Sequence, residues 1–583
     1  MPGWTNKILE IDLTARKTEV IELPAETYQK YIGGKGLSGY YLRQHIHHPW
    51  DSPEMPLLFF TGPLVGTASP TSGRMTISSK SPQTGTVGDT SVGGKFGTQI
   101  KKAGWDGIII KGKSRNLCGI SIIDSKVEFS DASSFYNKPI SEIIKHLPRQ
   151  GSNAITGPAA DNHVLFSSIC IDGHYIAGRN GLGLIMSSKN LKFIQVTGNG
   201  KVDVCDPVEL EKAREEIFRL VAASPILKGE AGISDYGTGA LYDLMHNRRM
   251  MPTDNFKSTW FAKAPALNAW HYKDKYQTKK TGCAGCHILC KKTGANGSII
   301  PEFETMSHFT ALLDNDDMDI VVEANRLCNE FGMDTISAAS TLACYAEINK
   351  IKIAGQNIPG LLKDIAFSQN EGKELKLGAR KYAMLKGQEE SAITVKGLEL
   401  PGYDPRGAYG MALAYATSTR GGCHLRAYPV SHEILRKPVS TDRLSFSGKA
   451  RIIKLNEDMN AVVDSLTACK FIFFAATLEE YAKMLSAVTG YHTNALELMK
   501  TGERIYFNDR IMNAINGFTV SDDDLPKRFF TEDGTSGDGM EIKAIDRDEF
   551  LQARSNYYKI RGLDENGLPL KEKCIELGLE WKS

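Results

Sequence analysis

The sequence predicts a multidomain α+β protein in which a β-rich N-terminal domain is followed by two mainly α-helical domains. The chain has 583 residues, which is too long for one hydrophobic core. Short segments with period-two alternation dominate its first third, and apolar residues recur with helical spacing after that. We place the domains at residues 1–204, 205–410 and 411–583.

The N-terminal domain is expected to begin with a β-hairpin. "KILEIDL" at 7–13 and "KTEVIEL" at 17–23 alternate apolar and polar residues on either side of a short turn. Four more short apolar segments are expected to be strands, at 57–62, 107–113, 119–124 and 126–130. Glycine-rich segments are expected to connect the strands, at 31–39, 91–97 and 177–190.

The first long helix is expected to begin near residue 205, at the boundary of the second domain. Asp206 is suited to the N-cap and Pro207 to the first helical position. A second helix is predicted within 317–334 and should end at Gly332, a residue type favoured at helix C-termini. Two further segments with helical spacing lie at 449–466 and 477–488.

Composition excludes several classes of protein. The formal net charge is +2, so no overall charge favours nucleic acid or an anionic membrane as a partner. The N-terminus lacks the apolar core of an export signal. The longest apolar runs are far shorter than the ~20 residues that cross a bilayer. We therefore expect a cytoplasmic protein, in which the eleven cysteines serve as ligands or buried thiols rather than in disulfides.

Three cysteines lie close together in "TGCAGCHILCKK" at 281–292. A zinc clip requires four ligands, commonly in paired CxxC knuckles, and only one knuckle is present. "CAGCH" matches a haem-attachment pattern, but such attachment is typical of exported proteins. A CxxCxxxC run can hold three corners of a 4Fe–4S cube, with the fourth thiolate supplied from elsewhere. The spacing favours the cluster and leaves zinc and haem as alternatives.

The fourth ligand must come from one of the eight remaining cysteines, most of which should be buried apolar residues. These are Cys118, Cys170, Cys205, Cys328, Cys344, Cys423, Cys469 and Cys574. Cys469 stands out because it ends "DSLTAC" at 464–469, which loosely repeats "DTISAA" at 334–339. Two equivalent carboxylates would suit a ligand with two similar halves.

In combination, these segments resemble the tungsten-containing aldehyde:ferredoxin oxidoreductase family over nearly the full chain. The matching blocks occur in the family's order and are "GWTNKILEIDLT", "YIGGKGL", "FTGPLVGTASPTSGRMTISSKSPQTG", "GGKFGTQIKKAGWDGIIIKGKS", "AGRNGLGLIMSSKNLK", the CxxCxxxC run, "PEFET", "GMDTIS", "PGYDPRGAYGMALAYATSTRGGCHLRAY" and "DSLTAC". The resemblance implies tungsten (rather than molybdenum) held by two pyranopterins, a magnesium ion linking their phosphates, and a nearby 4Fe–4S cluster. It also implies an aldehyde as the small-molecule substrate, and ferredoxin or an iron–sulfur carrier subunit as the electron acceptor.

The resemblance assigns cofactor-binding roles to six residues. Asp334 and Asp464 would each accept hydrogen bonds from one pterin; simple helix capping is the alternative for these carboxylates. Arg74, Arg179, Gly93 and Gly94 would contact phosphates and the pterin tail; a surface turn is the alternative for the arginines. Where the family usually has "NSGG", this chain has Ser91, Val92, Gly93 and Gly94, which puts the contacts at this position in doubt.

For the reaction, the resemblance implies that Glu304 and His424 are the acid–base pair, with Glu302 as the neighbouring competitor. Cys283, Cys286, Cys290 and Cys469 would hold the cluster. The expected function is an oxygen-sensitive oxidoreductase that converts aldehydes to carboxylic acids. The alternatives are a related tungstoenzyme subunit with another substrate, such as an aromatic acyl thioester, and a noncatalytic iron–sulfur electron-transfer protein.

One family feature is missing. Some members carry an ExxH pair that binds iron between two subunits, whereas the corresponding helix here reads "NRLCNEFGMD". An iron-bridged dimer is therefore not supported. The oligomeric state stays open, and a homo-oligomer is compatible with the sequence.

Overall fold

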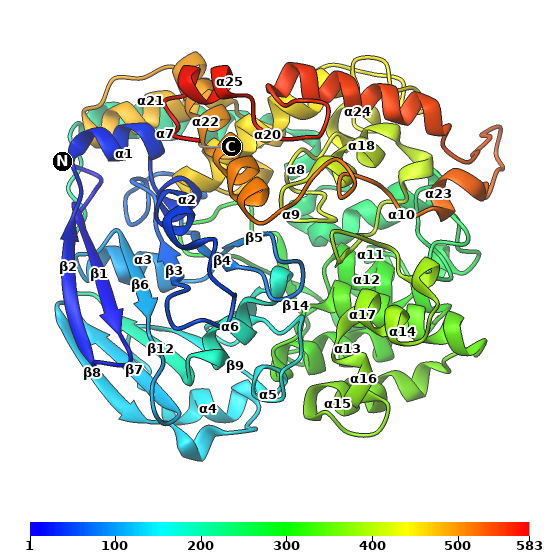
Figure 1. Ribbon diagram of the computed structural model, residues 1–583, viewed down its shortest axis with the longest axis horizontal. Coiled ribbons are helices and arrows are strands. Elements are labelled where there is room, and N and C mark those ends of the chain that lie inside the picture. The colour runs from blue at the N-terminus through cyan, green and yellow to red at the C-terminus, as the bar shows by residue number, and fades with distance from the viewer. Residues whose placement is uncertain (582–583) are drawn as a thin grey trace.

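A computed structural model describes residues 1–581 of the chain. The protein is a mixed α/β molecule with a β-rich N-terminal part and a mostly helical remainder, as predicted. Figure 1 shows the strands of the N-terminal part together on one side and the later helices beside and above them. This arrangement confirms the expected fold class.

The first sheet has six strands in the order β2-β1-β6-β3-β4-β5. The predicted hairpin is confirmed, because β1 and β2 pair antiparallel with Asp12 opposite Lys17. β1 pairs parallel with β6, and every other pair in this sheet is antiparallel. The strands are β1 (Lys7–Asp12), β2 (Lys17–Glu22), β3 (Leu57–Phe60), β4 (Met75–Lys80), β5 (Val87–Val92) and β6 (Gly107–Lys111).

The second sheet also has six strands, in the order β11-β10-β9-β12-β7-β8. They are β7 (Cys118–Ile123), β8 (Lys126–Asp131), β9 (Ser152–Thr156), β10 (Ile169–Ile171), β11 (Tyr175–Ala177) and β12 (Leu191–Thr197). Apolar side chains of both sheets belong to one hydrophobic core, which includes Ile108 and Ile110 from the first sheet and Ile120 and Ile194 from the second. The two sheets therefore form one packed unit.

Helices are also present in the N-terminal part, and three of them correct the sequence analysis. They are α1 (Ala25–Tyr31), α2 (Gly34–His45), α3 (Phe96–Lys102), α4 (Ile140–His146), α5 (Pro158–Asp161) and α6 (Leu182–Ser188). The predicted connections 31–39, 91–97 and 177–190 are not only connections, since α2 begins in the first, α3 begins in the second and α6 lies in the third. The reason is close packing: a Cβ atom at Gly34 would lie 2.3 Å from the carbonyl oxygen of Asp464.

The remainder of the described chain is mostly helical. Its helices are α7 (Pro207–Ala223), α8 (Pro225–Lys228), α9 (Ile233–Tyr236), α10 (Tyr242–Asn247), α11 (Ala269–Tyr276), α12 (Phe303–Phe309), α13 (Met318–Phe331), α14 (Thr335–Asn349), α15 (Ile358–Phe367), α16 (Gly372–Leu375), α17 (Gly378–Leu385), α18 (Tyr409–Thr417), α19 (Val430–Glu433), α20 (Lys449–Leu466), α21 (Leu478–Thr489), α22 (Ala495–Ile515), α23 (Arg528–Thr531), α24 (Arg547–Arg561) and α25 (Lys571–Glu576). Two short hairpins interrupt them, β13 (Lys279–Thr281) with β14 (Lys291–Thr293) and β15 (Thr394–Val395) with β16 (Leu398–Glu399).

The predicted helix ends are confirmed by local hydrogen bonds. The Asp206 side chain accepts from the backbone N–H groups of Val208 and Glu209 at the start of α7. Gly332 ends α13 with a φ of 73°, in the left-handed region that glycine adopts without strain. A capping box at Thr477 starts α21. Across residues 1–581, no helix combines the length and apolar character needed to cross a membrane.

Candidate functional site

A cavity with a volume of about 1450 Å³ lies between the N-terminal sheets and the helical part. Its walls come from β5, the segment before η2 (Arg179–Gly181), the β13–β14 hairpin, α12 and one side of α20 along most of its length. All but one of the site residues predicted from the sequence line it. The exception is Gly94. Residues from all parts of the chain thus converge on one space.

The three clustered cysteines lie in the loop that joins β13 to β14. This hairpin brings Cys283, Cys286 and Cys290 to the cavity, and the Cys286 N–H donates to the Cys283 carbonyl oxygen at 3.1 Å. Gly285 has a φ of +68°, which only glycine adopts easily, so it makes the tight turn between the first two cysteines. The Tyr175 hydroxyl holds the loop by donating to the Gly282 carbonyl oxygen at 2.7 Å.

Cys469 approaches the same part of the cavity from the segment between α20 and η9 (Lys470–Phe474). Its N–H donates to the Thr71 carbonyl oxygen at 3.0 Å. None of the other seven candidate cysteines lines the cavity in the part of the chain that the structure describes. Within residues 1–581, no three His, Cys, Asp or Glu side chains lie close enough together to hold a single metal ion.

Glu304 and His424 face each other across the cavity. Glu304 lies in the first turn of α12, where its Oε2 accepts from the Gly402 N–H at 2.7 Å. Its Oε1 lies 3.6 Å from Nε2 of His424. Glu302, the competitor, is instead directed to Lys291, with Oε1 3.3 Å from Nζ. The geometry therefore favours Glu304 as the carboxyl group next to the imidazole.

Burial controls the ionisation of this pair. It raises the pKa of Glu304 to about 8, although the hydrogen bond from Gly402 opposes the shift. Burial also lowers the pKa of His424 well below its usual value, and the charges of Arg179 and Arg420 lower it further. At neutral pH the site thus contains a protonated carboxyl group beside a neutral imidazole, an arrangement suited to proton transfer.

His308 is a neighbour that the sequence analysis did not identify. Its Nδ1 lies 2.7 Å from the Glu304 carbonyl oxygen and its Nε2 3.1 Å from the Leu400 carbonyl oxygen. Burial lowers its pKa to about 4, so it is neutral at pH 7. The sequence did contain a signal for this contact, because residues four positions apart on one helix, such as Glu304 and His308, are neighbours on its surface.

Asp334 both caps a helix and pairs with a site arginine. Its carboxylate accepts from the N–H groups of Ile336 and Ser337 at the start of α14. Its Oδ2 lies 3.3 Å from Nη1 of Arg179. The other terminal nitrogen of Arg179 donates to the Glu399 carbonyl oxygen at 2.6 Å. Asp334 therefore caps a helix, as the alternative interpretation predicted, and it also lies on the wall of the cavity.

Asp464 occupies a different local environment. It lies in the last turn of α20 rather than before a helix, and its Oδ2 accepts from Nζ of Lys470 at 2.5 Å. The resemblance between residues 334–339 and 464–469 therefore does not reflect equivalent local structure. The capping alternative is wrong for Asp464, because its carboxylate points from inside a helix to the cavity.

The segment of β5 and the residues after it lie against the cysteine loop. Arg74 donates from Nε to Ser91 Oγ at 2.9 Å and from Nη2 to the Ser91 carbonyl oxygen at 2.7 Å. Ser91 thus engages the guanidinium where the family usually has asparagine. A Cβ atom at Gly93 would lie only 2.3 Å from Sγ of Cys283. Gly94, with a φ of +103°, turns the chain away from the cavity.

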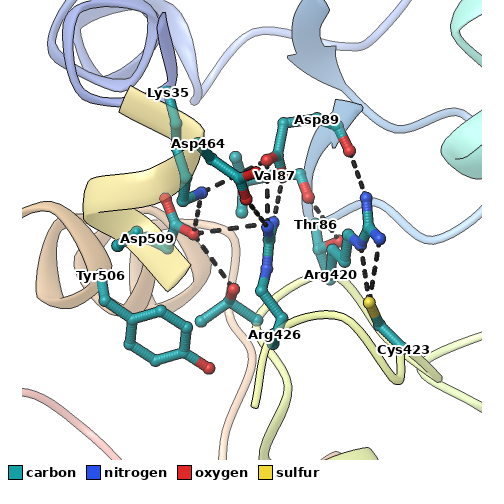
Figure 2. A network of polar contacts seen from close by, with 12 residues as sticks. Lys35, Thr86, Val87, Asp89, Arg420, Cys423, Arg426, Asp464, Tyr506 and Asp509 are labelled. Carbon is teal, nitrogen blue, oxygen red and sulfur yellow. Dashed lines mark hydrogen bonds and ion pairs between the residues drawn. The ribbon is translucent and has the colours of Figure 1, made fainter. Parts of the chain in front are cut away.

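A buried network of charges supports the cavity wall, and the sequence analysis did not identify it (Figure 2). The carboxylate of Asp89 on β5 accepts hydrogen bonds from both terminal nitrogens of Arg426, one of them at 3.0 Å. It also lies 3.4 Å from Nζ of Lys35. Lys35 also contacts Asp509 of α22 at 2.6 Å. Burial alone would raise the pKa of Asp89, but Arg426, Lys35 and Arg420 hold it well below its usual range.

Cys423 belongs to this network and is not directed to the cavity. Its Sγ accepts from Nε and Nη2 of Arg420, at 3.1 and 2.9 Å, and from the Leu425 N–H at 3.3 Å. Burial would raise the pKa of Cys423, but the two arginines Arg420 and Arg426 lower it overall. Both arginines lie within the segment 401–428 that carries part of the family resemblance, and this position could have identified them as site residues.

Several buried polar atoms on residues that line the cavity have no hydrogen-bond partner within the described chain. They are Glu304 Oε1, Arg426 Nε and Asp464 Oδ1. Buried polar groups are nearly always paired in folded proteins, so these donors and acceptors require a polar ligand. Together with four thiols, they fit a large anionic cofactor with ring N–H groups and a separate iron–sulfur cluster.

Comparison with known proteins gives consistent matches over the whole chain. Residues 8–198 match the family described as aldehyde ferredoxin oxidoreductase, N-terminal domain, and residues 212–579 match aldehyde ferredoxin oxidoreductase, domains 2 and 3. The tungsten-containing aldehyde ferredoxin oxidoreductase of Pyrococcus horikoshii is 36% identical, with 100% of each chain covered. That of Thermococcus kodakarensis is 34% identical, with 99% of each chain covered.

A solved structure has the same fold. It is the active-site complex BamBC of benzoyl coenzyme A reductase in complex with 1,5-dienoyl-CoA. The TM-score is 0.83 at 23% sequence identity, and the match covers 99% of this chain and 97% of the other.

Proposed function

We propose, from the premise that this chain belongs to the aldehyde ferredoxin oxidoreductase family, that it oxidises aldehydes to carboxylic acids at a tungsten–bispyranopterin centre. Electrons leave through a 4Fe–4S cluster to ferredoxin or a similar carrier. The observation that carries the proposal is the convergence of the Glu304–His424 pair and four cysteines on one cavity.

The unpartnered atoms indicate how the chain would hold the cofactor. Asp334 and Asp464 would each accept ring N–H groups of one pterin, and the free Oδ1 of Asp464 supports this role. Arg74 and Arg179 would meet the phosphates and the pterin tails, where a magnesium ion would link the phosphates. Gly93 and Gly94 would keep the adjoining backbone free of side chains. In this assignment residues 1–204 form the base, and 205–410 and 411–583 each supply one aspartate.

Cys283, Cys286, Cys290 and Cys469 would hold the cluster. Only five positions separate Asp464 from Cys469, and the intervening turn is fixed by the contact between Asp464 and Lys470. One segment would therefore position a pterin and the cluster together. Such proximity suits electron transfer out of the site.

Proton transfer is the part of the reaction that the chain itself performs. Conversion of an aldehyde and water to a carboxylic acid releases two electrons and two protons. When bound, the tungsten centre supplies the acceptor for the electrons. Glu304, in its deprotonated form, would take a proton from the aldehyde hydrate through Oε1, and His424 would orient the substrate oxygen or relay that proton.

The proposal is tested by metal analysis followed by assay. Protein purified without oxygen should contain tungsten, iron and pterin, and should reduce a viologen dye when an aldehyde is added. Zinc near one per chain with no tungsten would overturn the proposal. Tungsten and iron without turnover of any aldehyde would instead favour a related reaction on another substrate, such as an acyl thioester.

Gly93→Ala is expected to weaken the cluster, because the added methyl group would occupy the position of the Cys283 thiol. Displacement of a metal ligand of this kind should cost on the order of 10-fold or more in cluster affinity. Iron per chain and the absorbance of the cluster measure the loss. Gly360→Ala is the matched control, since no atom lies within 4 Å of its new Cβ. Equal iron content in the two variants would contradict the assignment of Cys283.

A further inference from the structure

A row of aromatic rings extends from the acid–base pair along the cavity. The centroid of the His424 ring lies 5.4 Å from that of Tyr403 and 6.0 Å from that of Tyr428. Tyr428 meets Phe474 edge-on at 6.3 Å, and Phe474 stacks on Phe471 at 6.2 Å. All of these rings line the cavity.

The cavity has a buried end and an end that is open to solvent. At the inner end, the side chains of His424 and Glu304 are only 16% and 18% exposed. Val439 and Leu455 also line the cavity but are 59% and 46% exposed, which marks the place where it meets solvent. Tyr428, Phe471 and Phe474 are half-buried. These three rings thus present part of their surface to the cavity that also contains Glu304.

These rings pack against the core and line the cavity at the same time. Tyr428 is partly buried against one core cluster, and Phe471 and Phe474 are partly buried against another. Tyr428 adopts a φ of +48°, an uncommon conformation for a bulky side chain that costs of order 1 kcal/mol or more. This conformation places its ring between His424 and Phe474. Strained conformations cluster at functional sites, and this one sets a ring on the wall of the cavity.

We propose that the preferred substrates are aldehydes with an aromatic or similarly bulky apolar group, and that Phe474 and Tyr428 contact that group. The proposal deepens the proposed function and rests on it. An aromatic ring that lies against these two rings gains offset-stacked or edge-on contacts that a methyl group cannot make. The aldehyde carbon would then lie at the Glu304 end, and the ring would lie toward Phe474.

Competition between benzaldehyde and acetaldehyde tests this substrate preference in the enzyme that contains its tungsten cofactor and its cluster. We expect a higher kcat/KM for benzaldehyde. Phe474→Leu should raise KM for benzaldehyde about 3- to 10-fold, since one aromatic contact is lost, and should change KM for acetaldehyde by a smaller factor. Phe135→Leu is the matched control, because Phe135 is also half-buried but does not line the cavity.

A binding measurement provides a readout other than turnover. Acetophenone, an aromatic ketone that cannot be oxidised to an acid in this way, should bind to the loaded enzyme in calorimetry. Its Kd should rise by the same factor in Phe474→Leu and remain unchanged in Phe135→Leu. Equal or better turnover of acetaldehyde, or the same KM and Kd in both variants, would overturn the substrate class while the proposed function stands. Failure of both aldehydes would instead remove the proposed function.

Discussion

Glu304→Gln is expected to lower kcat/KM for aldehydes by about 100- to 10,000-fold, the usual contribution of a general acid or base. Glutamine preserves the shape of the side chain and can retain the contact with the Gly402 N–H through its amide oxygen. It cannot accept a proton from the substrate at neutral pH. Steady-state kinetics with a viologen acceptor, on enzyme with equal tungsten and iron content, measures the effect.

The pH dependence should identify the same group. Because burial raises the pKa of Glu304 to about 8, the fraction in the basic form grows with pH up to that value. We expect kcat/KM of the wild-type enzyme to rise with pH and to level off above about 8. In Glu304→Gln this rise should disappear from the residual activity.

The stability of the folded protein should fall as pH rises, whereas kcat/KM increases. A carboxyl group whose pKa is higher in the folded than in the unfolded protein binds more protons when folded, so its contribution to stability is lost as pH increases from about 4.5 to about 8. Glu304→Gln removes this loss and should unfold at the same or a higher temperature than the wild type at pH 9. A low activity accompanied by lower stability would therefore indicate a structural defect.

Glu302→Gln is the matched control for this prediction. Glu302 is two positions away, is about half exposed and pairs with Lys291, so its loss should change kcat/KM only slightly. Should Glu302→Gln lose activity and Glu304→Gln retain it, the assignment of the base would be wrong.

Cys469→Ala is expected to remove the 4Fe–4S cluster or convert it to a form with fewer irons. Loss of a direct ligand should exceed the roughly 10- to 100-fold cost of losing a residue that only supports a ligand. Aldehyde-dependent reduction of ferredoxin should fall accordingly, because electrons then lack their exit. Iron per chain and the electron paramagnetic resonance signal of the reduced enzyme report the change.

Two further variants make the Cys469 result specific. Cys469→Ser, which retains an oxygen ligand, should keep part of the iron with an altered signal. Cys205→Ala changes an exposed cysteine that does not line the cavity and should leave the cluster intact. An unchanged signal in Cys469→Ala would mean that another residue is the fourth ligand.

Features that depend on neighbouring residues could be predicted well from the sequence. The β1–β2 hairpin follows from period-two alternation around a turn, and the ends of α7 and α13 follow from Asp206 and Gly332. Each of these depends on hydrogen bonds or side-chain directions within a few residues. Cys469 was singled out by a loose repeat and by the family resemblance. The two copies of the repeat differ in local structure, although Cys469 does line the same cavity as the cysteine loop.

The helix α2 and the charge network could not be derived in this way. α2 forms in a glycine-rich segment because its glycines allow the backbone to approach α20, and this packing outweighs the weak helix propensity of glycine. The charge network joins four distant segments of the chain, which contain Lys35, Asp89, Arg426 and Asp509. No spacing in the sequence therefore relates these residues to one another. Each would be costly to bury alone and is stable only with its partners in place.

The sequence by itself thus determined the family and the β-rich and helical parts, and it predicted the candidate ligands and the candidate acid–base pair. Only the tertiary structure decided which carboxyl group faces His424, how Asp334 and Asp464 differ, and which rings lead to them. The reason is physical. Residue type and short-range pattern specify what a side chain can do, whereas burial, pKa and unpartnered hydrogen-bonding atoms arise from contacts between segments hundreds of residues apart.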